Sequence, residues 1–345
     1  MKPLKEKIWP VNQVALFVGM SFFIIFSLRY ASDVIVPFLI ALVIAIIFSP
    51  LFGWLESKKI SRVLSLVFIF TLIGVFLLFF SAYVFNEIKD FIANYQEIKT
   101  KFLASENGIV HYLESFGFSL DGAKLQFVFE QYNLLDVVKK FLSQANSQFS
   151  NIFIIIFMVL FMLLEAKSFH QKILKITTDY GIDQKLFLEI VNKIKNYFML
   201  KVKTSFLTGI LVFFSLWYFS IPYYFLWAVL AFFLNFIPVV GSILASIPAL
   251  IFAFMSFDFM TTLWVGICYL LINMLVGNFL EPRIMGRGLG MSALVIFISM
   301  IFWGWIFGPT GMILSVPLTM VLQYFFAQYK ETQWIALLLS DYSTS

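Results

Sequence analysis

Residues that catalyse reactions or bind metals are scarce in this sequence of 345 residues. The single cysteine, Cys268, lies inside an apolar run, which excludes a disulfide within the chain and a cysteine-based metal site. The two histidines, His111 and His170, fall in segments far apart in the sequence. We therefore expect no metal site and no cofactor, because the usual ligands are too few.

The motifs of energy-coupling and hydrolytic enzymes are missing as well. The chain has no G-x-x-x-x-G-K-[S/T] phosphate loop, so we do not expect it to hydrolyse ATP. It has neither an H-E-x-x-H zinc motif nor a G-x-S-x-G nucleophile motif. An intramembrane hydrolase is therefore disfavoured, and we predict that the protein is not an enzyme.

Charge is sparse, and long apolar runs take its place. Charged residues make up 12% of the chain and hydrophobic residues 61%, with a mean hydropathy of +0.93. A soluble domain is about one quarter charged, so the composition indicates an integral membrane protein. The runs are continuous and do not alternate, which predicts an all-α polytopic protein and argues against a membrane β-barrel. The net charge of +5 needs no nucleic-acid partner, since lysines in cytoplasmic loops explain it.

The order of apolar and polar segments divides the chain into five parts. Lysines precede the first apolar run, which we interpret as a retained helix that starts inside the cell. We predict N-terminal transmembrane helices acting as a scaffold (1–85), an extracytoplasmic amphipathic helical section (86–148), a transmembrane helix with a cytoplasmic amphipathic section (149–203), a transport core (204–330) and a cytoplasmic tail (331–345).

Lysines set the expected orientation. The segment 165–203 carries eight of them: Lys167, Lys172, Lys175, Lys185, Lys193, Lys195, Lys201 and Lys203. Ordinary positive-inside topology explains this charge better than a nucleotide or RNA site, and it places both termini in the cytoplasm. In 86–148, apolar residues recur every three or four positions, for example Ile88, Phe91 and Tyr95. We interpret them as packing residues, with a membrane-surface or partner-docking role as the alternative.

Two pairs of short apolar segments interrupt the second half. The first pair, 223–234 and 242–256, is hinged on 235–241, and the second pair, 291–307 and 311–329, on 304–311. Each segment is shorter than the roughly 20 residues that cross a bilayer comfortably. The preceding helices, 204–220 and 260–280, cross in opposite directions, so we predict two re-entrant hairpins in an inverted arrangement. The two units are not visibly alike in sequence, and full crossings remain the alternative.

The hinges supply the candidate site. Glycine and proline interrupt helical hydrogen bonding and leave backbone N–H and C=O groups without partners. Lipid cannot form hydrogen bonds with these groups, so the breaks must be buried in protein or line a cavity. Amides and hydroxyls dominate the polar residues there, which suits a small, neutral, polyhydroxylated solute. The candidate substrate-binding or gating residues are Asn235, Pro238, Gly241, Asn278, Glu281, Gly304, Gly308, Gly311, Ser315 and Pro317.

Several of these residues also have a purely structural interpretation. Glu281 is either coupled to transport or is an interfacial cap that pairs with Arg283. Asn235 either faces a solute or satisfies backbone groups freed by Pro238. Trp303 and Trp305 we interpret as packing residues or interface anchors.

The same C-terminal region resembles the signature of a known family. The residues that match this signature are Asn278, Glu281-Pro282-Arg283, Gly286, Trp303-Gly304-Trp305, Gly308-Pro309-Thr310-Gly311 and Ser315-Val316-Pro317. Together they resemble the autoinducer-2 exporter family. The resemblance implies an exporter of autoinducer-2 or another small solute in the bacterial inner membrane, assembled as a homo-oligomer, with a pentamer expected. Some members of that family are assigned sodium- or lithium-proton exchange.

These observations favour a secondary transporter or exporter of a small polar solute that works within the lipid bilayer. The resemblance points to autoinducer-2 as that solute. A sodium (or lithium)/proton antiporter is the alternative, and a membrane scaffold without transport activity is a second one.

Overall fold

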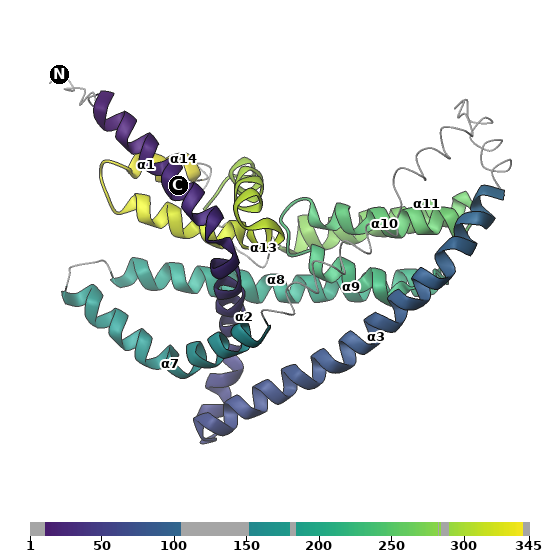
Figure 1. Ribbon diagram of the computed structural model, residues 1–345, viewed down its shortest axis with the longest axis horizontal. Helices are drawn as coiled ribbons and strands as arrows, with labels where there is room; N and C mark the ends of the chain where they lie inside the picture. Colours follow the sequence, from purple (N-terminus) through teal and green to yellow (C-terminus); the bar gives the residue numbers. More distant parts are fainter. Residues whose placement is uncertain (1–10, 105–151, 180–183, 282, 284–289, 341–345) are drawn as a thin grey trace.

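A computed structural model describes residues 11–104, 152–179, 184–281, 283 and 290–340 (Figure 1). Within these ranges every named element is helical, which confirms the predicted all-α class. The elements are α1 (Val11–Tyr30), α2 (Ser32–Ser57), α3 (Arg62–Ala104), α7 (Ile152–Asp179), α8 (Gln184–Tyr218), α9 (Tyr224–Leu234), α10 (Gly241–Ser256), α11 (Phe259–Asn273), the π-helix η1 (Met274–Leu280), α13 (Ala293–Ala327) and α14 (Gln333–Leu339).

The apolar helices have the dimensions of membrane spans. Among the described residues, five stretches are long and apolar enough to cross a bilayer: Ser32–Ser57, Arg62–Ile98, Val191–Tyr218, Phe259–Leu280 and Ala293–Ala327. Helices α9 and α10 are apolar but shorter, with 11 and 16 residues. A polytopic membrane protein is therefore confirmed, whereas the membrane depth of the short helices stays a prediction.

Two helices are longer than the sequence pattern suggested. Helix α3 has 43 residues and runs through position 85, where we expected the membrane helix to give way to a separate amphipathic one. Helix α8 has 35 residues and joins the lysine-rich section to the following crossing helix without interruption at position 203. The divisions near 85 and 203 thus fall inside continuous helices; as functional divisions they remain predictions.

The far end of α3 packs onto the second half of the chain. Ile88, Phe91 and Tyr95 are buried, and the ring of Phe91 lies 5.8 Å from that of Trp227 in α9 and 5.8 Å from that of Phe252 in α10. The packing interpretation of these residues is confirmed. The second predicted amphipathic helix, within 125–142, lies outside the described residues.

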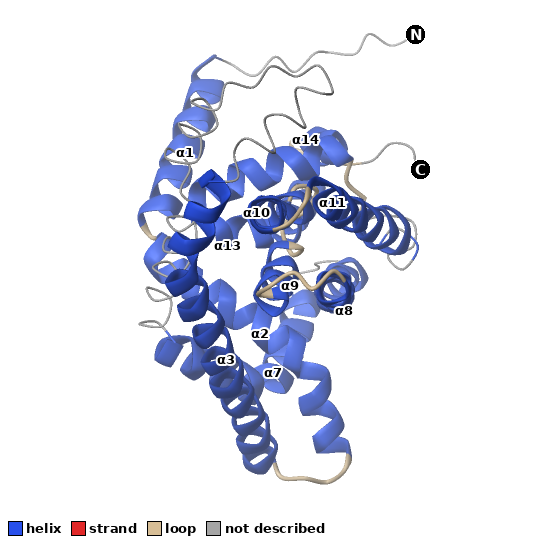
Figure 2. Cartoon of the chain, turned by 90° about the vertical axis from the view of Figure 1, so that its right-hand side faces the viewer, coloured by secondary structure: helices blue, strands red, loops and turns tan. Residues whose placement is uncertain are grey.

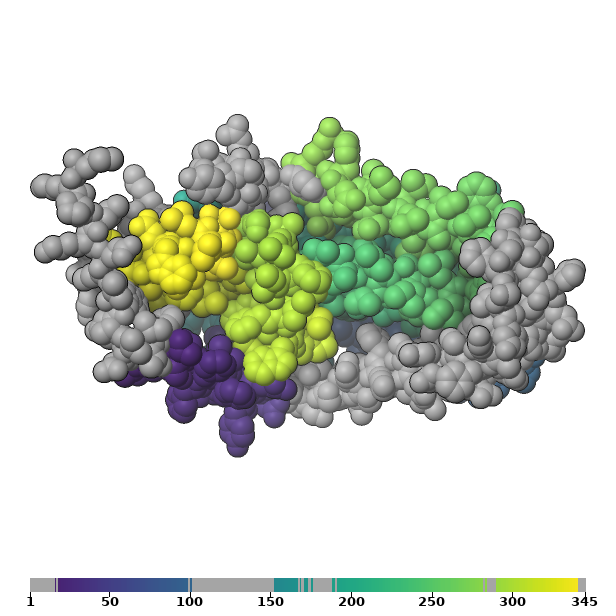
Figure 3. Space-filling view, turned by 90° about the horizontal axis from the view of Figure 1, so that it is seen from above, coloured from purple at the N-terminus to yellow at the C-terminus, as the bar shows by residue number. Residues whose placement is uncertain are grey.

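Helices α8, α9, α10 and α11 form a two-layer unit. In the views of Figures 1 and 2, α10 and α11 lie side by side above α8 and α9. A single apolar cluster joins them, with fully buried residues such as Val212, Trp227 and Val265. From above, the yellow C-terminal helices lie beside this green unit (Figure 3). These four helices, which include the first part of the predicted transport core (204–330), thus share one apolar core.

The first predicted break is a tight reversal between α9 and α10. The chain leaves α9 at Leu234, turns through 235–240, and re-enters a helix at Gly241. A Cβ atom at Gly241 would overlap the carbonyl of Leu234, so only glycine allows this approach. Asp258 caps the N-terminus of α11 and Ser292 caps that of α13, because the side chain of each accepts a hydrogen bond from a backbone N–H of the first turn.

The second predicted break lies within α13. Gly308 has φ 63° and ψ −149°, a conformation open only to glycine, and Pro309 follows it. A Cβ atom at Gly311 would overlap the carbonyl of Trp303, and the indole of Trp303 donates a 3.0 Å hydrogen bond to Thr319. The two arms of α13 therefore fold toward each other. Trp303 is buried and stacks on Phe307, which confirms its packing role.

The two hairpins share a short stretch of similar sequence at their turns, although the units as a whole are not visibly alike. Gly241-Ser-Ile-Leu-Ala245 opens the second arm of the first hairpin, and Gly311-Met-Ile-Leu-Ser315 opens the second arm of the other. A helical proline follows each, at Pro248 and Pro317. The similarity was missed because it covers only a few residues around each glycine. It supports an internal repeat, as in many secondary transporters.

These close approaches predict the effect of adding a single methyl group. Gly241→Ala and Gly311→Ala should each lower stability by about 1–3 kcal/mol, because the new Cβ meets backbone that cannot rotate away. The measurement is the unfolding midpoint of the purified protein in detergent. Gly74→Ala is the control, since a Cβ there meets nothing within 4 Å. Midpoints equal to that of the control would contradict the tight turns.

Candidate functional site

A polar stripe on α8 marks the centre of the second half. Lys201, Thr204, Ser205 and Thr208 recur at the three- and four-residue spacing of one helix face, and all four are buried. Further along the same helix, Val212 and Leu216 are buried in the apolar core. A buried lysine in a membrane protein is costly unless it is paired, so its partners indicate what the site is built to do.

The ammonium group of Lys201 is fully engaged. It donates hydrogen bonds to both carboxylate oxygens of Glu281, at 2.8 and 3.0 Å, and to the backbone carbonyl of Asn235, at 3.2 Å. Thr204 donates a 3.0 Å bond to the same carboxylate. The side chains of Lys201 and Glu281 are only 8% and 16% exposed. One lysine thus joins α8, the first reversal and the end of η1.

Glu281 therefore does not pair with Arg283, the pairing considered from the sequence. The guanidinium of Arg283 lies 4.0 Å from the ring of Phe279, and the residue is exposed. Glu281 is the last residue of the α11–η1 segment and is turned toward α8. It is a member of an internal ion pair and not an interfacial cap.

Asn235 connects this ion pair to the rest of the site. Its carbonyl accepts from Lys201, and its side-chain amide donates a 3.1 Å bond to Ser205. Four residues later Val239 has φ 66°, a left-handed conformation that is unfavourable for a branched side chain. Such strain persists only where the surrounding contacts impose it, and it is common at ligand-binding and switch segments.

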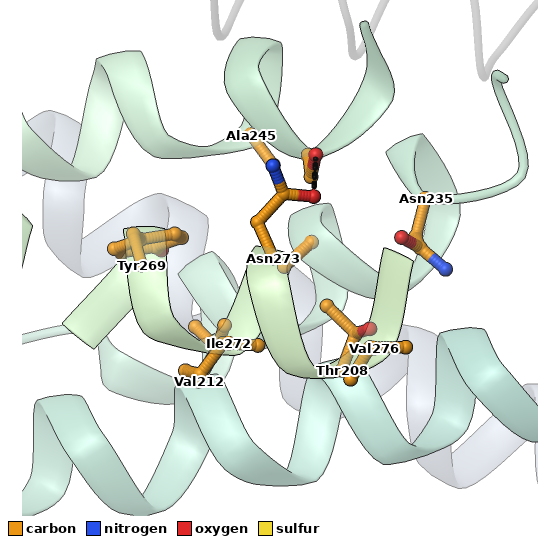
Figure 4. A pocket seen from close by; sticks show the side chains of 10 residues that line it. Thr208, Val212, Asn235, Ala245, Tyr269, Ile272, Asn273 and Val276 are labelled. Carbon is orange, nitrogen blue, oxygen red and sulfur yellow. Dashed lines mark hydrogen bonds between the residues drawn. The ribbon is translucent and has the colours of Figure 1, made fainter. Parts of the chain in front are cut away.

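A small pocket opens beside the ion pair, between α8, α9, α10 and α11 (Figure 4). Its walls are close together and leave room for about one water molecule in this conformation. Asn235 lies at one end and Tyr269 at the other, with Asn273 between them. The lining residues are Thr208, Val212, Ala231, Asn235, Ser242, Ala245, Tyr269, Ile272, Asn273 and Val276.

The polar groups of the pocket are only partly satisfied. Ser242 donates a 2.7 Å hydrogen bond to the amide oxygen of Asn273. The hydroxyls of Thr208 and Tyr269, in residues 4% and 7% exposed, have no hydrogen-bond partner among the described residues. A buried hydroxyl without a partner costs about 1–3 kcal/mol, so two in one pocket indicate a place for a polar molecule.

The predicted site residues separate into two groups. Asn235, Pro238 and Gly241 lie at the first reversal, and Glu281 joins them through Lys201. The second hairpin instead packs on α1, α2 and α8, and its residues do not line the pocket. There Met312 packs against Gly304, and the hydroxyl of the buried Ser315 donates to the carbonyl of Met312. The members of this second group are Gly304, Gly308, Gly311, Ser315 and the buried Pro317.

Asn278 lies on η1 and is exposed, and it does not line the pocket. A π-helix is rare and commonly occurs at functional sites, because the extra residue re-aims the side chains that follow. In this chain the segment precedes Glu281 directly. Asn278 thus lies in the segment that leads to Glu281, and it is not part of the pocket lining.

Sequence reasoning missed the residues that build the site around Glu281. Lys201 was counted among the cytoplasmic lysines that set orientation, and Thr208 and Tyr269 were not singled out. One signal could have found Lys201: positions 201, 204, 205 and 208 are polar and share one helix face where α8 passes into its apolar part. Tyr269 carries no such signal, because a tyrosine within an apolar run is common in a packed core.

Long apolar helices, two glycine-dependent reversals and a buried ion pair beside a small pocket define a polytopic membrane protein.

Comparison with known proteins gives the family. The sequence profile of the family described as "AI-2E family transporter" matches residues 14–331. The chain is 33% identical to the AI-2 transport protein TqsA of Escherichia coli (strain K12), over 95% of this chain and 96% of that protein. The chain belongs to the AI-2E transporter family, as the resemblance in its C-terminal signature predicted.

Other relatives are named for the same general activity. A protein of Haemophilus influenzae whose name assigns it provisionally to transport is 32% identical over 96% of this chain and 97% of its own length. YhhT of Escherichia coli (strain K12), named in the same provisional way, is 28% identical over 92% of this chain and 90% of its own. The chain is thus a bacterial membrane protein of a transport family.

The ion pair predicts an asymmetry between single and double variants. Lys201→Met or Glu281→Gln alone should lower stability by about 3–5 kcal/mol, because each leaves a buried charge without its counter-charge. The double variant should recover most of this loss. Unfolding midpoints in detergent measure the effect. Arg62→Ala, which breaks an exposed ion pair with Glu56, is the control and should cost less than about 1 kcal/mol. Additive losses in the double variant would contradict the pairing.

Proposed function

We propose that the protein is a secondary transporter that exports a small polar solute, with autoinducer-2 as the first candidate. The observation that carries the proposal is Lys201, which holds the first reversal and the end of η1 against α8 from inside the apolar core. An ion pair there stabilises a packed core less than apolar residues would, so a role in switching between conformations accounts for it better than a purely structural one.

The same contacts suggest how the protein moves. Lys201 and Thr204 are on α8, whereas their acceptors belong to the α9–α10 reversal and to η1. Shifting the hairpin relative to α8 must break or exchange these hydrogen bonds. The ion pair therefore stabilises one conformation, and a second conformation lies only a few kcal/mol higher in free energy. We propose that the α9–α10 hairpin shifts against α8 while 204–329 as a whole moves against a scaffold of N-terminal helices.

The membrane context of this proposal comes from the lysine distribution and the relatives. We propose a protein of the bacterial inner membrane with both termini in the cytoplasm, assembled as a homo-oligomer with a pentamer expected. We also propose that the two hairpins are re-entrant, so that each enters the membrane and leaves it on the same side.

Autoinducer-2 is proposed because TqsA, which is named for its transport, is similar over nearly the whole chain. Deleting the gene should raise cellular autoinducer-2 and lower it in the medium, measured by bioassay or mass spectrometry of both fractions. Re-expression of the wild type should restore the distribution. The stable double variant Lys201→Met/Glu281→Gln should export at least about fivefold more slowly, as expected if the pair biases the transport cycle by about 1 kcal/mol. An unchanged distribution on deletion would remove autoinducer-2 as the substrate.

The alternative, sodium- or lithium-proton exchange, depends on Glu281 as the group that titrates. Its contacts argue against this role, because both carboxylate oxygens already accept hydrogen bonds from Lys201 and one also accepts from Thr204, so the group is occupied by partners inside the protein. We therefore expect proteoliposomes to show no proton flux driven by a sodium or lithium gradient, measured with a pH-sensitive dye inside the vesicles. Liposomes without protein set the background. Flux that is present in the wild type and lost in Glu281→Gln would establish the exchanger instead.

A further inference from the structure

We infer that the pocket between α8, α9, α10 and α11 is a binding site for a neutral solute that carries several hydroxyl groups. The inference rests on the proposed transport function and assigns the residues that recognise its substrate. Thr208 and Tyr269 are the central ones, because their hydroxyls are more than nine-tenths buried, line the pocket and lack a hydrogen-bond partner among the described residues.

The two hydroxyls come from different helices and need a partner that neither helix provides. A threonine inside a helix can often bond the carbonyl one turn back, and Thr208 does not do so. Tyr269 lies at the far end of the pocket from Asn235 (Figure 4). A hydroxyl both donates and accepts, so a solute with hydroxyls along a short carbon chain can satisfy both ends.

The charges around the pocket select a neutral solute. None of the lining residues is charged, and the neighbouring Lys201 and Glu281 neutralise each other. Half of the lining is apolar: Val212, Ala231, Ala245, Ile272 and Val276. Such walls suit the carbon skeleton of an organic solute better than a bare cation, which requires oxygen ligands all round.

The pocket can widen where the chain turns. Its walls are too close for a five-carbon solute in this conformation, so α9 and α10 must move away from α8 and α11. Asn235 is part of both the pocket and the contact with Lys201. A movement that admits the solute therefore also displaces the carbonyl that accepts a hydrogen bond from Lys201. Solute binding in the pocket is thereby coupled to the ion pair.

Equilibrium binding to the purified full chain in lipid nanodiscs tests the inference. The probes are radiolabelled xylitol and ribose, and ribonate as the charged counterpart of ribose. Both neutral probes should bind saturably, and ribonate at least about tenfold more weakly, because its carboxylate finds no cation free to pair with it. Thr208→Val and Tyr269→Phe each remove one hydroxyl with little change in shape. Each should weaken xylitol binding by about 5- to 20-fold.

Two matched variants separate recognition from folding. Thr208→Ser keeps the hydroxyl and should bind xylitol within about twofold of the wild type. Ser65→Ala removes another buried hydroxyl without a partner, in a residue of α3 outside the pocket, and should leave binding unchanged.

Each remaining outcome is decisive. If neither neutral probe binds the wild type, the pocket holds water only; if sodium alone binds there, it is a cation site; either result overturns the inference. Binding that is indifferent to Thr208→Val and Tyr269→Phe overturns it too. The assay needs no gradient and no autoinducer-2. Saturable polyol binding, together with an autoinducer-2 distribution that gene deletion leaves unchanged, would therefore remove autoinducer-2 as the substrate and leave the binding site standing.

Discussion

A charge pair inside an apolar helical core is the constraint on which the second half of this protein depends. Lys201 has three hydrogen-bond acceptors, and they belong to two chain segments that also make one further hydrogen bond each to α8, through Ser205 and Thr204. Apolar packing in a membrane is weakly directional, since lipid tails are as apolar as leucine. The ion pair adds direction: the reversal at Asn235 and the end of η1 must both face the same point on α8.

Much of the fold follows from the sequence because the membrane restricts the choices. Continuous apolar runs without charge can only be helices in a bilayer, and the positions of Gly241, Gly308 and Pro309 mark the reversals that the structure contains. Helix continuity was harder to foresee. In α3 and α8 the side chains change from apolar to polar or the reverse along the helix, while the helical backbone continues without a break. A change in composition therefore does not mark the end of a helix here.

The candidate site was predictable only in part, for a physical reason. Asn235 and Glu281 stand out because amides and carboxylates are rare in apolar segments. Lys201 is just as exceptional in its burial, but it lies near the end of a lysine-rich stretch whose other members set the topology. Position along the chain cannot distinguish the two roles, because the difference is made by Glu281, which is 80 residues away. The hydroxyls of Thr208 and Tyr269 depend in the same way on what the fold places opposite them.

The π-helical turn before Glu281 has a geometric consequence of its own. Successive residues of an α-helix are rotated by about 100°, so the number of residues wound into Met274–Leu280 fixes the direction in which Glu281 leaves the axis. Rewinding this stretch to ordinary α-helical pitch would displace one residue and swing the carboxylate by about a quarter turn. A change of this segment from π-helix to α-helix would thus break the ion pair without any movement of α11.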